Sequence, residues 1–186
     1  MIGVGCSKPK VILHVQNHPP LDEYKQLINE GVYRPLRADE IKNIISQSGN
    51  HWRKIFSIYA KLLFAITKAQ YQHHSQRSLP NTWQDYRDTV LLTEHCIGAI
   101  QWESDAHCFS CAGVHLICGF TYAAALLPDV NWQKEKNGEP VRLWQLTSEV
   151  SSIDKAEDGS AIWTVPYFDY RQFPNALIEE ALNTIF

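Results

Sequence analysis

The sequence lacks the glycine-rich loops that hold nucleotide phosphates. Neither a Walker-type loop nor a G-x-G-x-x-G pattern occurs, which argues against nucleotide-driven phosphoryl transfer and against hydride transfer on a dinucleotide-binding fold. The nucleophile motif G-x-S-x-G is also missing, so a hydrolase triad has no recognisable anchor. We therefore expect no nucleotide cofactor, and nothing else in the chain calls for a cofactor.

An apolar run long enough to span a membrane is missing as well. The most apolar stretch, residues 55–66, is interrupted by Lys61 and bounded by Arg53, Lys54 and Lys68. The first residues hold no apolar signal core. The sequence therefore predicts a cytoplasmic protein without a membrane partner.

The chain carries no excess of positive charge. Its 17 Lys and Arg residues stand against 20 Asp and Glu residues, for a formal net charge of -3. A protein that depends on phosphate contacts is usually basic, so this balance weakens nucleic-acid binding, although a local patch can still be positive.

What the chain does contain is the composition of one globular domain. Of its 186 residues 45% are hydrophobic, and seven Phe, eight Tyr and six Trp supply large side chains for a core. We expect residues 1–186 to form a single domain.

The apolar pattern indicates an α/β fold. Short β-branched runs alternate with segments in which apolar residues recur at helical spacing. This order predicts a three-layer sandwich, a short and mainly parallel sheet with helices on both faces. The expected strands are residues 10–15, 89–93 (with 97–102 beside it), 114–118, 141–150 and 161–165; the expected helices are residues 21–30, about 41–48, 51–72, 120–127, and one that begins at 175.

Ligands of such sheets bind beyond the carboxyl ends of the strands. Asn17 and His18 follow the first strand on a Pro-braced loop, where a carboxamide and an imidazole can fix a water molecule or contact a polar ring. After the last strand, Tyr167 can stack on a base, while Asp169 and Arg171 can bind a base edge or a phosphate. Residue type alone favours the other interpretation, in which this aromatic loop packs on the core while Asp169 pairs with Arg171 in solvent.

Cysteine and histidine gather between residues 95 and 118. Nitrogen and sulfur ligands suit zinc, but His115 and Cys118 lie three apart in one strand and so face opposite sides of the sheet. The alternatives are therefore buried thiols without a metal, a reactive thiol, or a zinc site. The ligands of such a zinc site would come from the set His95, Cys96, His107, Cys108 and Cys111.

Four segments resemble the uracil-DNA glycosylase superfamily in content and order. They are KVILHVQNHPP, TVLLTEH, VHLICGFTYAAALL and WTVPYFDYRQFPN, about a quarter of the chain. The resemblance implies that Asn17 takes the water-positioning place, that Glu94 lies near the base-reading place, and that Tyr167 to Asp169 lie near the final DNA-reading loop. Val15 replaces a family glycine, and the His of the final loop is missing, so the resemblance implies at most impaired N-glycosidic hydrolysis.

The sequence thus leaves three hypotheses. The first is a protein of glycosylase-like architecture that binds a nucleobase or nucleic acid; a bacterial family that shares only the architecture fits the same segments. The second is a non-catalytic interaction domain, with a protein partner or a second copy held by aromatic residues such as Trp132, Trp144 and Tyr170. The third is a protein that depends on the zinc or thiol cluster at Cys96–Cys111.

Overall fold

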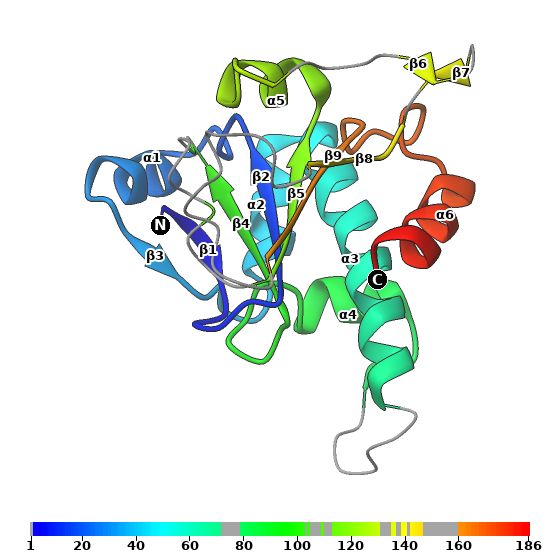
Figure 1. The fold of residues 1–186 in the computed structure, drawn as a ribbon. Coiled ribbons are helices and arrows are strands. Elements are labelled where there is room, and N and C mark those ends of the chain that lie inside the picture. Colours follow the sequence, from blue (N-terminus) through cyan, green and yellow to red (C-terminus); the bar gives the residue numbers. More distant parts are fainter. Residues whose placement is uncertain are drawn as a thin grey trace.

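The computed structural model shows a three-layer α/β sandwich with one large sheet (Figure 1). It describes residues 2–71, 79–102, 104, 109, 113–130, 135–136, 139–140, 142–146 and 160–186. The α/β class and the mainly parallel sheet predicted from the sequence are both confirmed.

The large sheet has the strand order β3-β1-β4-β2-β5-β9-β8. Its centre is four parallel strands, β4, β2, β5 and β9, and β1 and β8 are antiparallel to their inner neighbours. A separate pair, β6 and β7, forms a two-stranded sheet. The bounds are β1 Gly3–Gly5, β2 Val11–Val15, β3 Tyr33–Arg34, β4 Gly98–Trp102, β5 Val114–Cys118, β6 Glu135–Lys136, β7 Glu139–Pro140, β8 Trp144–Leu146 and β9 Ala161–Val165.

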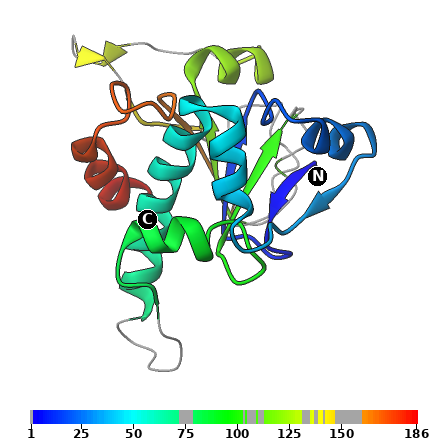
Figure 2. The same cartoon turned by 180° about the vertical axis from the view of Figure 1, so that it is seen from behind.

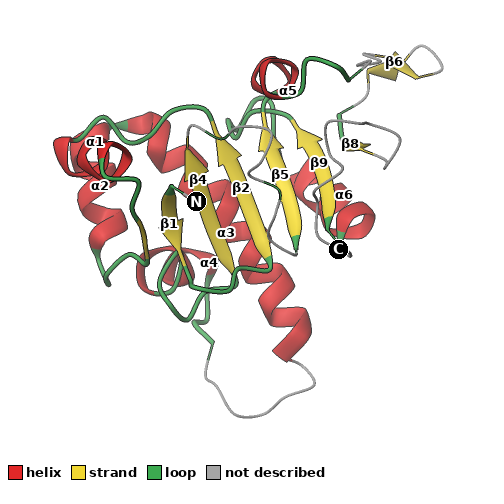
Figure 3. Cartoon of the chain, turned by 60° about the vertical axis from the view of Figure 1, so that its left-hand side comes forward, coloured by secondary structure: helices red, strands yellow, loops and turns green. Residues whose placement is uncertain are grey.

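Most of the helices lie on one face of this sheet, as Figures 2 and 3 show from two sides. The larger core lies under α1, α2, α3, α4 and α6, whereas α5 and Phe109 pack on the other face. Among the described residues, no helix has both the length and the apolar character needed to cross a bilayer. The bounds are α1 Asp22–Asn29, α2 Glu40–Ser48, α3 Asn50–Tyr71, α4 Trp83–Thr89, α5 Phe120–Leu126 and α6 Asn175–Ile185.

Helix α3 forms the centre of the larger core. Its stripe at helical spacing, including Trp52, Phe56 and Leu63, is buried against the sheet. The Tyr59 hydroxyl lies 2.9 Å from the carbonyl oxygens of both Val11 and Ala99, so it joins two neighbouring strands to the helix.

The strand predicted at residues 89–93 is wrong. Residues 83–89 form α4, and the residues after it form a turn in which Leu92 has a left-handed φ of 61°. Leu91 and Leu92 are nevertheless fully buried, because the turn packs into the core. A short apolar run does not distinguish a buried turn from a buried strand.

Candidate functional site

A cavity of about 310 Å³ opens at the carboxyl ends of β2, β5 and β9. Parallel strands end at this edge, where open α/β sheets hold their ligands. The residues that line it come from the loop after β2, the junction of β5 with α5, and the loop after β9; they are Gln16, Asn17, Cys118, Gly119, Phe120, Thr121, Tyr122, Tyr167 and Gln172.

The loop after β2 brings two carboxamides to the cavity. Gln16 and Asn17 are both exposed and both line it. His18 turns to its own loop, where its Nδ1 lies 2.7 Å from the carbonyl oxygen of Pro19. Asn17 therefore lies where the sequence predicted a site residue, whereas His18 is not among the lining residues.

Gly119 forms the junction between β5 and α5. Its φ of 100° lies in a region that side chains with a Cβ rarely adopt, and a Cβ here would lie 3.4 Å from the Tyr167 ring. Its amide donates a 2.8 Å hydrogen bond to the Val165 carbonyl at the end of β9. The glycine thus sets the spacing between two walls of the cavity.

Tyr167 supplies an aromatic wall and is held from outside by His51. The two rings stack with centroids 5.5 Å apart, and the phenol oxygen lies 2.8 Å from His51 Nε2. Burial raises the pKa of Tyr167, so the phenol stays protonated and can donate that hydrogen bond. His51 is the second residue of α3, and nothing in the surrounding sequence marked it as a site residue.

Asp169 organises the loop after β9. Its carboxylate binds Lys54 on α3 and accepts a 3.0 Å hydrogen bond from the Arg171 amide. The hydrogen bond from Lys54 lowers the pKa of Asp169 below its ordinary value. The side-chain pair of Asp169 and Arg171 considered from the sequence is thus replaced by an ion pair with Lys54, and Asp169 is not among the residues that line the cavity.

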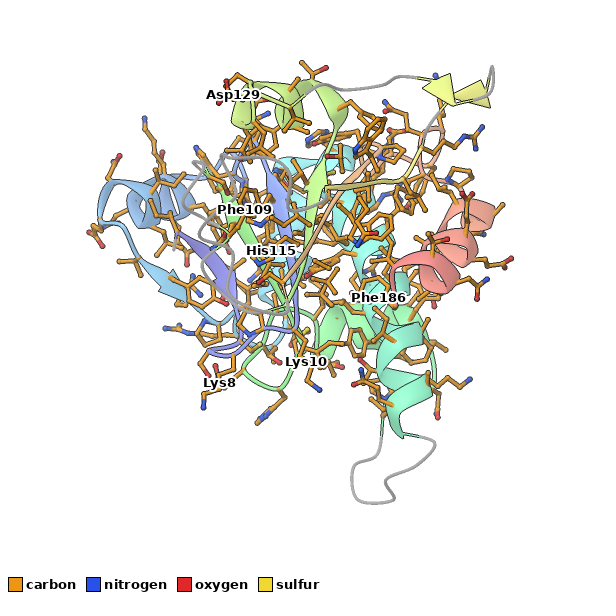
Figure 4. All side chains as sticks on the ribbon, in the orientation of Figure 1. Lys8, Lys10, Phe109, His115, Asp129 and Phe186 are labelled. Atoms are coloured by element: carbon orange, nitrogen blue, oxygen red, sulfur yellow. The ribbon has the colours of Figure 1, made fainter. Side chains whose placement is uncertain are left out.

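Glu94 does not join this site. It lies before β4, at the amino ends of the parallel strands, and its carboxylate accepts hydrogen bonds from the amide and the hydroxyl of Ser7. Figure 4 shows Lys8, the next residue after Ser7, at the end of the molecule opposite Asp129, which follows α5. Since residues 89–93 are not a strand, the predicted position of Glu94 at a carboxyl end is wrong.

Of the five ligands of the alternative zinc site, the structure describes His95 and Cys96, whose side chains have different surroundings. His95 is exposed, and Cys96 is buried in the larger core, where its sulfur lies 3.5 Å from the Tyr86 hydroxyl. His107, Cys108 and Cys111 lie outside the described residues. Within the part of the chain that the structure describes, no three His, Cys, Asp or Glu side chains are placed to hold a metal ion.

Burial also argues against the described cysteines as nucleophiles. It raises the pKa of Cys6 to about 11 and that of Cys118 to about 12, and it raises the pKa of Cys96 as well. At neutral pH all three stay thiols. Cys118, the cysteine among the described residues that line the cavity, therefore contributes an uncharged and mainly apolar surface to its wall.

A pair of buried imidazoles lies on the other face of the sheet. His14 Nε2 is 2.9 Å from His115 Nδ1, His14 Nδ1 is 2.9 Å from the Ser104 hydroxyl, and the Phe109 ring packs on both imidazoles. Figure 4 labels Phe109 and His115 of this group. Two imidazole nitrogens on one tetrahedral zinc ion lie about 3.3 Å apart, so the shorter distance is that of a hydrogen bond. His115 and Cys118 do face opposite sides, as the sequence predicted.

A second cavity, about 440 Å³, lies between α1 and α2. Its wall carries Asp22, Glu23 and Glu40, and both glutamates are paired with Arg34. This acidic lining opposes an anionic ligand. The cavity at the strand ends, lined by amides, hydroxyls and aromatic rings, is the better candidate for a polar ring.

The sequence identified part of this site. Asn17 and Tyr167 do meet at one cavity, whereas His51, Lys54 and Gln172 were not predicted. The aromatic residues named for an interaction surface differ in exposure. Tyr170 is 41% exposed and Trp144 is partly buried, whereas Trp132 lies outside the described residues.

The fold and this cavity define an α/β protein with a polar cavity at the carboxyl ends of its parallel strands. The chain belongs to the family of unknown function DUF6942, whose sequence pattern matches residues 2–186. Neither a curated protein nor a solved structure matches the chain.

Proposed function

We propose that this protein binds a nucleobase, free or within a nucleic acid, in the cavity at the carboxyl ends of β2, β5 and β9. The observation that carries the proposal is that Asn17 and Tyr167, from the loops after two strands far apart in the sequence, line one cavity of about 310 Å³. A carboxamide can pair with the edge of a base while an aromatic ring stacks on its face.

The lining also limits the chemistry of the site. Among the described residues that line the cavity, none carries a carboxylate or an imidazole. Asn17 can position a water molecule, but no general base in the lining activates it. N-glycosidic hydrolysis at this site is therefore at most weak, and binding is the principal activity. The resemblance to the uracil-DNA glycosylase superfamily supports the same assignment.

Equilibrium binding of free bases and of short oligonucleotides tests the proposal. Tyr167→Leu removes a stacking contact and should weaken binding about tenfold, and Asn17→Ala should weaken it about fivefold. Asn43→Ala, in the wall of the acidic cavity, is the matched control and should leave the affinity unchanged. Base release from oligonucleotides with a modified base, followed in the same samples, measures any hydrolysis.

If no base or oligonucleotide binds, or if Asn43→Ala weakens binding as much as Asn17→Ala, the proposed function is wrong. Thermal unfolding of each variant checks that a lost signal is not a lost fold.

A further inference from the structure

A strip of cationic and aromatic side chains begins beside the cavity and follows α3. We define it by His51, Lys54 and Lys61 on α3, Trp83 and Arg87 on α4, and Tyr170 in the loop after β9. Lys61 lies between two rings, 4.9 Å from the centroid of Trp83 and 6.0 Å from that of Tyr170. The Arg87 guanidinium lies 5.7 Å from the centroid of the same Trp83 ring.

The strip is continuous with the cavity. His51 stacks on Tyr167 in the cavity wall, and Lys54 binds Asp169 two residues further along that loop. Lys61 lies ten residues after His51 on the helix, which corresponds to about 15 Å of helix axis. Figure 2 shows α3 passing from that end of the sheet towards α4, with α6 alongside.

The charges of the strip leave one ammonium group without a counter-ion. Lys54 is paired with Asp169, and Arg87 with Asp88. Lys61 instead donates a 2.8 Å hydrogen bond to the amide oxygen of Asn175, and among the described residues it forms no ion pair. A protein of net charge -3 thus holds an unneutralised cation between two aromatic rings.

The chemistry that fits this surface is an anionic chain with planar groups. Phosphates bind ammonium groups, and unpaired bases stack on exposed aromatic rings such as Tyr170, which is 41% exposed. A duplex keeps its bases paired and offers no free face to such a ring. About 15 Å accommodates roughly four stacked nucleotides of one strand.

We infer that a single strand of nucleic acid runs from the cavity along this strip, with a backbone phosphate on Lys61 and a base on Tyr170. The inference rests on the proposed function, because it extends the cavity's base-binding site along α3. It also names the ligand as a strand rather than a free base.

Fluorescence anisotropy with a labelled oligothymidylate dodecamer and with the trimer tests the inference. The dodecamer should bind more tightly than the trimer. Lys61→Gln should weaken only the dodecamer, about fivefold, and reduce the slope of log affinity against log salt by about 0.7. Tyr170→Ala should weaken the dodecamer about tenfold. Lys8→Gln removes the same charge in the loop before β2, at the end of the molecule opposite Asp129, and should leave both affinities unchanged (Figure 4). An oligouridylate dodecamer in parallel reports whether the strand is DNA or RNA.

The inference that a strand binds along the strip is wrong if the dodecamer and the trimer bind with equal affinity, or if Lys61→Gln and Lys8→Gln have equal effects. Neither result would contradict base binding in the cavity. Loss of binding to both oligomers and to free bases would instead overturn the proposed function. Sedimentation velocity that shows self-association abolished by Tyr170→Ala would assign the surface to a second copy of the chain and also overturn the inference.

Discussion

Acid should destabilise this protein through the buried imidazole of His14. Its side chain is fully buried, and burial, followed by the neighbouring His115, holds the pKa of His14 well below its ordinary value. In the unfolded chain the same imidazole titrates near pH 6.5. The unfolded state therefore binds more protons below that pH, and stability falls as the pH falls.

The size of the effect follows from linkage. If folded His14 stays neutral over the whole interval, lowering the pH from about 7.5 to about 5.5 should reduce the free energy of unfolding by about 1.4 kcal/mol. The lowered pKa of Asp169 changes stability only as the pH falls through the ordinary carboxyl pKa of about 3.9 and below it, so the interval from about 7.5 to about 5.5 reports on imidazoles.

Urea unfolding of the wild type and of His14→Gln at both pH values measures this contribution. The pH-dependent loss should be about 1.4 kcal/mol smaller in the variant, because its unfolded state lacks the imidazole. Thr164→Val is the matched control: it alters a fully buried polar side chain of β9 without a titratable group, and it should keep the wild-type dependence. If the variant and the wild type lose equal stability, or if the NMR signals of His14 titrate near pH 6.5, the reasoning is refuted.

Three further predictions test the fold around the cavity. Gly119→Ala forces a Cβ into a positive-φ position and should lower stability by about 1–2 kcal/mol in urea unfolding; an unchanged midpoint would contradict the conformation of the junction. Tyr59→Phe removes a buried hydroxyl that bridges two strands and should cost about 1–2 kcal/mol in the same assay, whereas a neutral effect would show that the bridge is dispensable. A thiol reagent should label at most two of the five cysteines in the native protein and all five in denaturant, because the three described thiols are buried (Cys6, Cys96, Cys118); labelling of Cys96 in the native state would revive the reactive-thiol hypothesis.

Most of the sheet could be predicted from the sequence because its central strands are short apolar runs followed by turn residues. The strands at residues 114–118 and 161–165 were predicted with their observed bounds. Helix α4 was missed because only Tyr86 of its residues is buried, so it has no apolar stripe. Its start was nevertheless marked by Thr82, whose hydroxyl accepts a 3.1 Å hydrogen bond from the Asp85 amide.

The site was only half predictable for a related reason. Asn17 and Tyr167 follow strands directly, so the rule about carboxyl ends locates them. Glu94 was misplaced because its assignment depended on the wrong strand. His51 and Lys54 reach the site from a helix, and their positions depend on how α3 crosses the sheet, which no local pattern encodes.

The hydrogen bond from the Gly119 amide to the Val165 carbonyl joins the ends of β5 and β9, and it bears on how the cavity forms during folding. The wall that bears Asn17 follows the second strand of the chain, whereas the wall that bears Tyr167 follows the last, and β5 lies between them in the sheet. The cavity therefore does not exist until contacts of very long sequence separation have formed, which are the slowest to form. A ligand held between the two walls stabilises only the fully assembled sheet, so it should slow the hydrogen exchange of β9 amides more than that of α1 amides.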